Sequence, residues 1–431
     1  MKKILKKILS FALIYLGITL LFVSLIIGSY MLPDTNIRGH VAESIEQLKT
    51  EGNGYAPFFR QPGATLDTHT DSLMLNIALN KGINENQRTI EKAVENSFYE
   101  DNISAVTALE KNIEDNNINN HEYSRYWHGV QVFLRPLLLF FNYTEIRYIL
   151  MIIIISLLGL TFSMIGNQLS NRYVFAFAIT ICLMFVILIP VSLQYSSIFI
   201  ITLISMISVI SLYKYNKQKY ISILFFLIGA FSTYFDLLTY PLITLGLPLV
   251  LAVLLENKNK KLKVINQLFF IVKLGLLWGI GYGLLFFTKW VIASIILQKN
   301  VVNLAIDQLL FRVNGNETYP VNRLEVIKNN FNYFYVPIAK YILSTIFVIW
   351  GILMIFFRKK LKNLIVVVPL ICIAIVPYIW YILFAGHSSI HCWFTNKIQA
   401  MSLFAILCSM CYTIDFTNFK SIVEKIKEKK K

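Results

Sequence analysis

Two aspartates, Asp67 and Asp71, stand four residues apart in the stretch GATLDTHTDSLMLNIALN, residues 63–80. An irregular segment becomes an apolar, helix-like one at this point. Asp71, together with the neighbouring threonines, could therefore cap a helix that begins at Ser72. Capping explains one acid, but Asp67 lies a full turn earlier. A carboxylate that faces a cleft can instead act as a general base toward an acceptor hydroxyl or help to bind a metal ion. The pair therefore has a structural and a catalytic interpretation.

Basic side chains that suit a phosphate group follow further along the chain. The stretch SRYWHG contains Arg125 and His128, and Arg135 comes shortly afterwards. Arginine binds phosphate through a bidentate, fork-shaped guanidinium. The alternative is that aromatic residues anchor this stretch at a membrane surface while the arginines extend their charged ends toward water. Arg125, His128 and Arg135 are candidate substrate-binding residues.

An aspartate, two histidines and a lysine occur beside apolar segments. Asp236 in STYFDLLTYP ends an apolar run, and charged residues at membrane depth are costly and usually face a cavity. His387 and His391 in GHSSIHCWFTNK would share one face of a helix at four-residue spacing. They lack the glutamate and the third ligand of a zinc site, so a phosphate contact or a proton relay is favoured, and no metal or other cofactor is indicated. Lys397, just beyond, could pair with an anionic lipid head group.

The composition around these residues is that of a membrane protein. The chain has 431 residues, of which 56% are hydrophobic and 15% are charged. A soluble globular protein carries roughly a quarter charged residues. The formal net charge of +16 comes largely from lysine clusters in short stretches between apolar runs. Clusters of this kind mark cytoplasmic loops under the positive-inside rule, so the charge reflects topology and we expect no nucleic-acid partner.

Apolar runs bounded by charged residues predict an all-α polytopic membrane protein with about ten transmembrane helices, since each crossing requires about 20 apolar residues. With the N-terminus in the cytoplasm, every lysine-rich connection falls on the cytoplasmic side, and so does the C-terminus. Usage rich in Lys, Ile and Asn suggests a bacterial source, so the predicted location is the bacterial plasma membrane. The glycines of GIGYG at 279–283 lie within one run and indicate close helix packing rather than a nucleotide loop. The predicted spans are roughly 9–31, 146–166, 173–192, 197–213, 221–234, 241–256, 267–289, 340–357, 363–384 and 399–415.

The predicted outer face carries most of the polar sequence. The first outer loop, residues 32–144, holds fifteen Asp and Glu residues against nine Lys and Arg, so it is acidic within a basic protein. Its apolar residues recur at three- and four-residue spacing, which predicts amphipathic helices, and residues 129–141 predict a helix at the membrane interface. The other predicted parts are a first transmembrane helix in 1–31, a bundle of about nine helices in 145–415 with a second outer loop at 290–339, and a basic cytoplasmic tail at 416–431.

This arrangement resembles the GT-C superfamily of integral-membrane glycosyltransferases. Members share a first span, a large outer loop with amphipathic helices and an early acidic residue, and many further helices. The 9–31 span, the 32–144 loop and Asp67 or Asp71 at the helix DSLMLNIAL follow that order. The segments FDLLTYP and HSSIHCWFT also look like bacterial polytopic proteins of surface-polysaccharide synthesis. The adjacent Asp-Glu pair of many members is absent.

The resemblance implies a sugar donor carried on a polyprenyl phosphate. The residues give the same preference, because nucleotide sugars are cytosolic and the polar chemistry lies on the predicted outer face. We therefore expect a glycosyltransferase that modifies a cell-envelope glycan, with Asp71 or Asp67 as the base. Membrane lipids are further expected partners. The lipid phosphate would be held by Arg125, Arg135, His387 or His391.

Two other functions fit the same features. One is a transporter or flippase for a lipid-linked saccharide, which would show broken helices and buried ions near the membrane midplane. The other is a polysaccharide polymerase or ligase, whose large outer loop would be expected later in the chain. The concentration of ionisable residues at the outer face favours the transferase.

Overall fold

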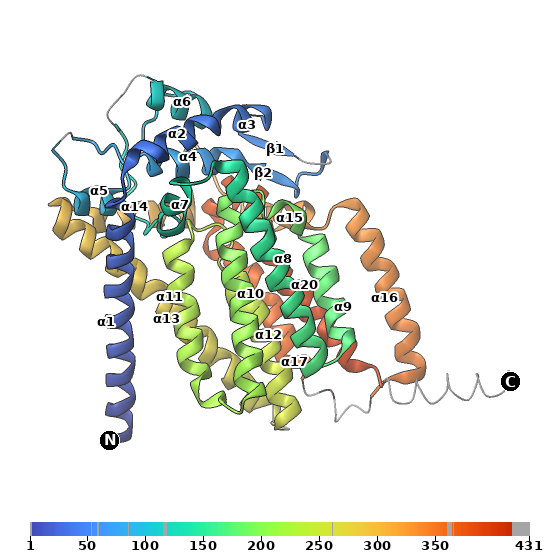
Figure 1. Ribbon diagram of the computed structural model, residues 1–431. Helices are drawn as coiled ribbons and strands as arrows, with labels where there is room; N and C mark the ends of the chain where they lie inside the picture. The colour runs from blue at the N-terminus through green and yellow to red at the C-terminus, as the bar shows by residue number, and fades with distance from the viewer. Residues whose placement is uncertain are drawn as a thin grey trace.

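The computed structural model describes residues 2–52, 54–57, 60–84, 86–114, 119–260, 262–359, 364 and 366–415. Helices make up nearly all of the regular structure in these ranges, as a bundle of long apolar helices beneath a smaller cap (Figure 1). The predicted cytoplasmic tail, 416–431, lies outside the described residues. The part of the chain that the structure describes is therefore all-α with the character of a polytopic membrane protein.

The cap is formed mainly by the chain between the first and second long helices. Its apolar side chains, Leu48, Met74, Leu75 and Leu109 among them, pack together into one buried cluster. It also holds a short antiparallel strand pair that the sequence analysis did not predict, with Tyr55 opposite Asp67. The cap elements are α2 (Asp34–Glu43), α3 (Ile45–Thr50), β1 (Tyr55–Pro57), β2 (Thr65–Asp67), α4 (Thr68–Ala78), α5 (Thr89–Glu95), α6 (Ala105–Glu114) and α7 (Gln131–Leu138).

The bundle contains the remaining helices. Helix α13 is longer than predicted and continues through Leu297, so the second outer region begins within a helix. The bundle elements are α1 (Lys2–Tyr30), α8 (Tyr143–Gln168), α9 (Asn171–Leu183), η2 (Val186–Leu188), α10 (Leu193–Lys214), η3 (Gln218–Tyr220), α11 (Ile221–Phe235), α12 (Leu242–Asn259), α13 (Val264–Leu297), α14 (Val301–Asn314), α15 (Arg323–Phe334), α16 (Pro337–Phe357), α17 (Val367–Leu383), α18 (Ala385–Ile390), α19 (Cys392–Thr395), η5 (Asn396–Ile398) and α20 (Gln399–Thr413).

Within the described ranges, six helices are long and apolar enough to cross a membrane, namely α1, α8, α10, α12, α13 and α16. Two shorter apolar helices, α9 and α17, accompany them. Each of the ten predicted ranges contains a helix, but α11 and α20 have 15 residues each. At 1.5 Å per residue, such a helix covers about 22 Å of a hydrocarbon layer about 30 Å thick. The count of ten crossings stays a prediction.

The ends of the bundle differ in charge. The N-terminus and the lysine-rich connections at 214–220 and 257–260 lie at the end opposite the cap (Figure 1). This arrangement is the one that the positive-inside rule requires if the cap faces outward.

Local sequence signals explain how the bundle is assembled around the cap. Asn142 and Glu145 form a capping box at the start of α8, each side chain bonding the other's backbone N–H. Glycine allows α11 and α13 to cross closely, because a Cβ on Gly281 would lie 2.1 Å from the carbonyl oxygen of Phe226. The close packing predicted for the GIGYG glycines is confirmed for Gly281 but not for Gly279 and Gly283, where an added Cβ would meet nothing within 4 Å.

Candidate functional site

Asp67, and not Asp71, caps the helix that follows the strand pair. Helix α4 begins at Thr68, four residues before the predicted start, because β2 ends at Asp67. Oδ1 of Asp67 accepts the backbone N–H of Thr70 at 2.9 Å, and Oδ2 accepts the Thr70 hydroxyl at 3.0 Å. A third donor, the Trp393 indole, lies 3.3 Å from Oδ2. The predicted cap at Asp71 is therefore corrected to Asp67.

Asp71 lies inside the first turn of α4 and caps a different helix. Its carboxylate accepts the backbone N–H of Leu193 at 2.9 Å and that of Gln194 at 3.3 Å, at the N-terminus of α10. The hydroxyls of Tyr143 at 2.5 Å and Ser192 at 3.2 Å also donate to it. A carboxylate has about four acceptor positions, so both Asp71 oxygens are filled. This geometry favours a positioning role for Asp71 over the predicted role as base.

Both of these cap acids are fully buried. Burial raises the pKa of Asp67 to about 6, against hydrogen bonds from Thr70 and Trp393 that oppose the shift. Burial likewise raises the pKa of Asp71 to about 6, and the Arg147 guanidinium is the largest opposing influence. Desolvation therefore outweighs the donors at each carboxylate.

Asp236 is the third buried acid and has fewer partners. It follows the last residue of α11, and its Oδ1 accepts the backbone N–H of Thr239 at 2.8 Å. Its Oδ2 has no hydrogen bond in the part of the chain that the structure describes, and the Tyr282 hydroxyl, equally without one, lies beside the carboxylate. Burial raises the pKa of Asp236 to about 7, opposed by the N–H groups of its own turn.

A chain of hydrogen bonds joins Asp71 to Asp236. Gln194 donates its backbone N–H to Asp71, and its side-chain Nε2 donates to the Thr239 hydroxyl at 2.9 Å. Thr239 in turn donates its backbone N–H to Asp236. Two acids that are 165 positions apart in the sequence thus meet at the outer end of α10.

The two predicted histidines lie next to each other and reach the same turn. Their ring centroids are 4.8 Å apart. His387 donates Nε2–H to the Leu238 carbonyl at 2.6 Å, and Nε2 of His391 accepts from the Arg312 guanidinium at 2.6 Å. Burial, followed by nearby positive charge, lowers the pKa of His391 to about 3, and the pKa of His387 is also well below its usual value. Both rings are therefore neutral near pH 7.

An indole links the histidines to the first acid. Trp393 donates to Asp67 and packs edge-on against the His391 ring, with centroids 5.1 Å apart. Among the described residues, no group of three or more His, Cys, Asp or Glu side chains is placed to hold a metal ion. We call the connected set the polar cluster; it consists of Asp67, Asp71, Gln194, Asp236, Thr239, Arg312, His387, His391 and Trp393.

Two arginines near the polar cluster carry charge that no carboxylate neutralises. Arg125 lies over the rings of Tyr123 at 4.6 Å and Tyr126 at 5.5 Å, and its Nε has no hydrogen bond. The charges of Arg125 and Arg312 both lower the proton affinity of the Tyr123 hydroxyl, so the two guanidinium groups act on the same region. Neither arginine forms an ion pair within the described ranges. Both are half-buried, which suits a site for an anion.

Three predicted substrate-binding residues have structural partners instead. Arg135 is fully buried and donates to the carbonyls of Ser29, Leu32 and Ala78, besides pairing with Asp34 at 2.6 Å. This arrangement joins the end of α1 to α4 and α7 and leaves no face for a lipid phosphate.

His128 and Lys397 are enclosed as well. His128 adopts a positive φ of 52° and contacts the Tyr123 carbonyl through Nε2 at 3.2 Å. The ammonium of Lys397 is buried and donates to the Gly63 carbonyl at 3.1 Å, so it does not reach a lipid head group. The structure assigns neither residue to the polar cluster.

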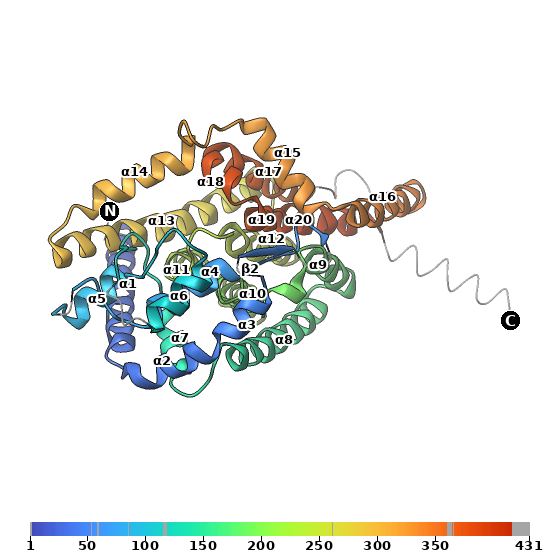
Figure 2. The same ribbon diagram turned by 90° about the horizontal axis from the view of Figure 1, so that it is seen from above.

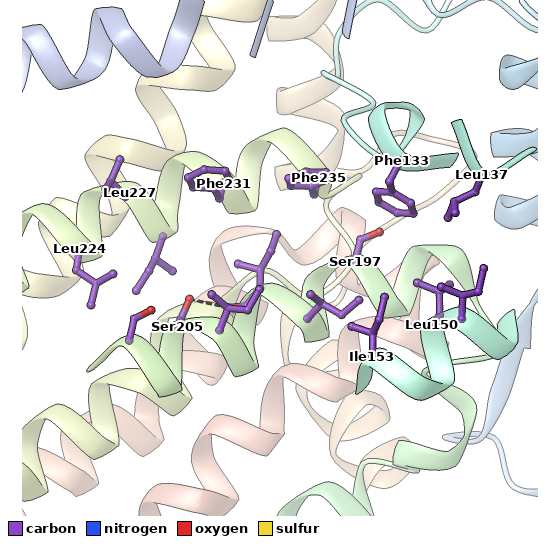
Figure 3. A pocket seen from close by; sticks show the side chains of 16 residues that line it. Phe133, Leu137, Leu150, Ile153, Ser197, Ser205, Leu224, Leu227, Phe231 and Phe235 are labelled. Carbon is purple, nitrogen blue, oxygen red and sulfur yellow. Dashed lines mark hydrogen bonds between the residues drawn. The ribbon is translucent and has the colours of Figure 1, made fainter. Parts of the chain in front are cut away.

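An apolar groove runs beside the polar cluster between α8, α10 and α11. It has a volume of about 510 Å³ and is closed at one end by Phe133 and Leu137 of α7 (Figure 3). The hydroxyl of Ser205 in its wall donates to a carbonyl of its own helix, so the wall is apolar. A second cavity of about 380 Å³ continues it toward the opposite end and shares Ser208 and Leu224.

The outer end of this groove lies one helical turn from the polar cluster. Ser197, in its wall, is three residues from Gln194, and Phe235 directly precedes Asp236. This groove was not predicted from the sequence, and neither were Arg312 and Trp393 as partners of the acids and histidines. Seen from above, α14 runs along the edge of the bundle beside α13 and leads toward α18 (Figure 2), and its Arg312 contacts His391 at the start of α19.

No protein-family model, no curated protein and no solved structure matches this chain.

Proposed function

We propose that this protein is a membrane glycosyltransferase, which transfers a sugar from a polyprenyl-phosphate donor to a cell-envelope glycan. The observation that carries the proposal is the position of the polar cluster. The buried carboxylates Asp71 and Asp236 lie about one helical turn beyond the outer end of an apolar groove that runs along α10 and α11, and the polar cluster also contains Arg312, which has no carboxylate partner among the described residues. A lipid-linked sugar has the complementary build, with an anionic group at the membrane surface and a long apolar chain within the bilayer.

The groove suits the lipid chain of such a donor. Helix α10 has 22 residues and is about 33 Å long at 1.5 Å per residue, which is close to the thickness of the hydrocarbon layer. An apolar chain gains roughly 25 cal/mol for each Å² removed from water, but far less when it leaves lipid. The groove would therefore orient the chain more than it would add affinity, with the phosphate at the outer end, toward the polar cluster.

The arginines and acids suit the proposed chemistry. When the bond between the sugar and the phosphate breaks, negative charge accumulates on the leaving phosphate. Arg125 and Arg312, which have no carboxylate partner, would stabilise that charge in a partly dehydrated site. A buried carboxylate with raised proton affinity would take the proton of the acceptor hydroxyl. Asp71 has no free acceptor position, and Asp67 has one.

The test is a transfer assay with purified protein in liposomes. The liposomes contain undecaprenyl-phosphate monosaccharides with a radiolabelled sugar, and the acceptor is the envelope fraction of the cells that naturally express the chain. We expect label to move from lipid to glycan. Periodate, which does not cross the membrane, reports in the same samples whether lipid-linked sugar changes leaflet. Movement between leaflets without transfer would establish the flippase alternative and refute the transferase.

A further inference from the structure

The turn between α11 and α12, residues 236–239, is surrounded by polar atoms that have no partner. Oδ2 of Asp236, Oε1 of Gln194 and the hydroxyl of Tyr282 are each buried without a hydrogen bond within the described ranges. Gln194 is bonded to this turn through Thr239, and Tyr282 lies beside Asp236. Buried polar atoms are nearly always hydrogen-bonded in native proteins. Three orphaned atoms around one turn therefore mark a place that binds a polar group.

The three buried acids differ in how many donors they already satisfy. Asp71 accepts four hydrogen bonds and Asp67 accepts three. Asp236 accepts one well-formed hydrogen bond, from the Thr239 N–H to Oδ1, while the Thr239 hydroxyl and the N–H groups of Leu237 and Leu238 lie close to the carboxylate. A general base must have an oxygen that can receive a new proton from a bound hydroxyl. Of these three carboxylates, Asp236 alone has an oxygen that no well-formed hydrogen bond fills, with the Tyr282 hydroxyl beside it.

Among the described residues, no charged side chain is an influence on the pKa of Asp236. Tyr282 from α13 and Tyr240 from α12 border the carboxylate. His387 from α18 reaches the same turn through the Leu238 carbonyl, and its buried ring is neutral. The proton affinity of Asp236 is thus set mainly by burial, which holds its pKa near pH 7, where a general base works best.

Tyr282, beside Asp236, is half-buried although its hydroxyl is enclosed. Tyr282 belongs to a row of aromatic side chains spaced four residues apart on α13. Successive ring centroids from Trp278 to Trp290 are 5.0, 5.3 and 5.9 Å apart. The row ends where Trp290 donates to the Arg125 carbonyl at 3.0 Å. The row of rings therefore extends from Tyr282, beside Asp236, to Trp290, beside Arg125.

We propose that Asp236 is the general base of the glycosyl transfer and that the Tyr282 hydroxyl holds the acceptor beside it. This inference rests on the proposed function and adds its acceptor subsite. The acceptor oxygen forms a bond to the anomeric carbon of the donor sugar. The bond from that carbon to the phosphate oxygen breaks, and the phosphate leaves with the electron pair. The acceptor proton moves to Oδ2 of Asp236.

The experiment compares D236N and Y282F with the unmodified protein in the liposome transfer assay. D236N removes the basic oxygen and keeps the shape, so transfer should fall by about 10² to 10⁴. The rise of rate with pH that the unmodified protein shows as Asp236 loses its proton should also disappear. Y282F should raise the KM for the acceptor by about tenfold through a lost hydrogen bond, with kcat and the pH profile retained.

Two further measurements make each outcome decisive. Crosslinking to a photoreactive undecaprenyl-phosphate sugar reports whether D236N still folds and binds the donor. E95Q is the matched control, because Glu95 is a buried carboxylate of α5 that pairs with Lys299.

If D236N transfers within threefold of the unmodified protein, or keeps its pH profile, Asp236 is not the base although the transferase stands. If D236N fails to crosslink, an unaltered KM in Y282F refutes the subsite. If the unmodified protein transfers no sugar, both proposals fall.

Discussion

The Asp71 carboxylate accepts the backbone N–H of Leu193 at 2.9 Å, so an acid of the cap holds the N-terminus of α10. The first backbone N–H groups of α10 have no partner within the helix, so they are free to donate to a carboxylate. The negative charge of that carboxylate also interacts favourably with the positive end of the helix dipole. The contact binds the cap to the bundle immediately beside the apolar groove. Asp71 is thus a residue on which the geometry of the outer end depends.

Asp71→Asn should cost stability more than chemistry. Asparagine keeps one acceptor oxygen, but its NH₂ group would face donors from α10 and leave one of them unsatisfied. We expect a loss of about 1–3 kcal/mol in unfolding free energy, the usual cost of an unpaired buried group. Thermal unfolding in detergent measures that loss, and transfer per folded molecule should fall by no more than about tenfold. If transfer per folded molecule instead falls by 10²-fold or more, Asp71 would again be the candidate for the general base.

Asp67→Asn is the matched comparison, since asparagine caps helices about as well as aspartate. The Thr70 N–H can still be accepted by the amide oxygen. The Trp393 indole would lose its acceptor if the NH₂ group replaces Oδ2. We expect a smaller loss of stability than in Asp71→Asn, together with a change in tryptophan fluorescence. If both variants lose the same unfolding free energy, the number of hydrogen bonds that each carboxylate accepts does not determine the cost.

The arginine pair gives a prediction about catalysis that does not depend on which acid is the base. Removing one donor that stabilises developing charge typically lowers kcat by 10²- to 10³-fold. We expect losses of this size for Arg125→Gln and Arg312→Gln in the transfer assay. Arg323→Gln is the control, because Arg323 is exposed and donates to the Ile382 carbonyl and Asn314. Equal rates in all three variants would remove the arginines from the phosphate site.

The groove gives a prediction about the lipid chain. Ser205 lies in its wall, and Ser205→Phe would fill part of the 510 Å³ volume with an aromatic ring. The KM for an undecaprenyl donor should rise by about tenfold or more, whereas a donor with a short isoprenoid chain should be unaffected. Leu276→Phe is the control, because Leu276 is 62% exposed on α13. Equal effects on long- and short-chain donors would show that the groove does not hold the chain.

The orientation of the bundle is testable by labelling. In a cysteine-free background, cysteines at Lys217 and Lys260 should resist an impermeant thiol reagent in intact cells, because both lie opposite the cap. A cysteine at Asp101, exposed on the cap, should react. Labelling of position 217 from outside would reverse the predicted orientation.

Much of the fold could be predicted because its signals are local. Apolar runs and lysine clusters locate the long helices, and three- and four-residue spacing locates the helices of the cap. The start of α4 could not be predicted in this way. It depends on the strand pair, in which Tyr55 opposite Asp67 ends the extended chain. That pairing involves residues twelve positions apart, so no local pattern reveals it.

The candidate site was predictable as a set of residue types but not as a set of contacts. Asp236, His387 and His391 were singled out for polar character beside apolar sequence, and they lie together. Arg312 resembles any basic residue of an amphipathic helix until α14 carries it to His391, 79 positions away. Arg135 was chosen by the same reasoning as Arg125, yet carbonyls at the ends of α1 and α4 surround it. Burial separates the two arginines, and burial follows from the tertiary fold.

The raised pKa of Asp236 predicts a pH-dependent difference in stability between the unmodified protein and D236N. The folded-state pKa of about 7 lies above the ordinary value of 3.8, so the folded state binds the proton more tightly than the unfolded state does. This contribution stabilises the fold fully below pH 3.8 and is lost as the pH rises through about 7. Asparagine has no proton to lose. D236N should therefore gain thermal stability relative to the unmodified protein as the pH is raised from 5 to 8. The histidines titrate equally in both proteins and cancel in the difference. Melting curves across this range measure it, and a difference that does not change with pH would mean that Asp236 is not held protonated by burial.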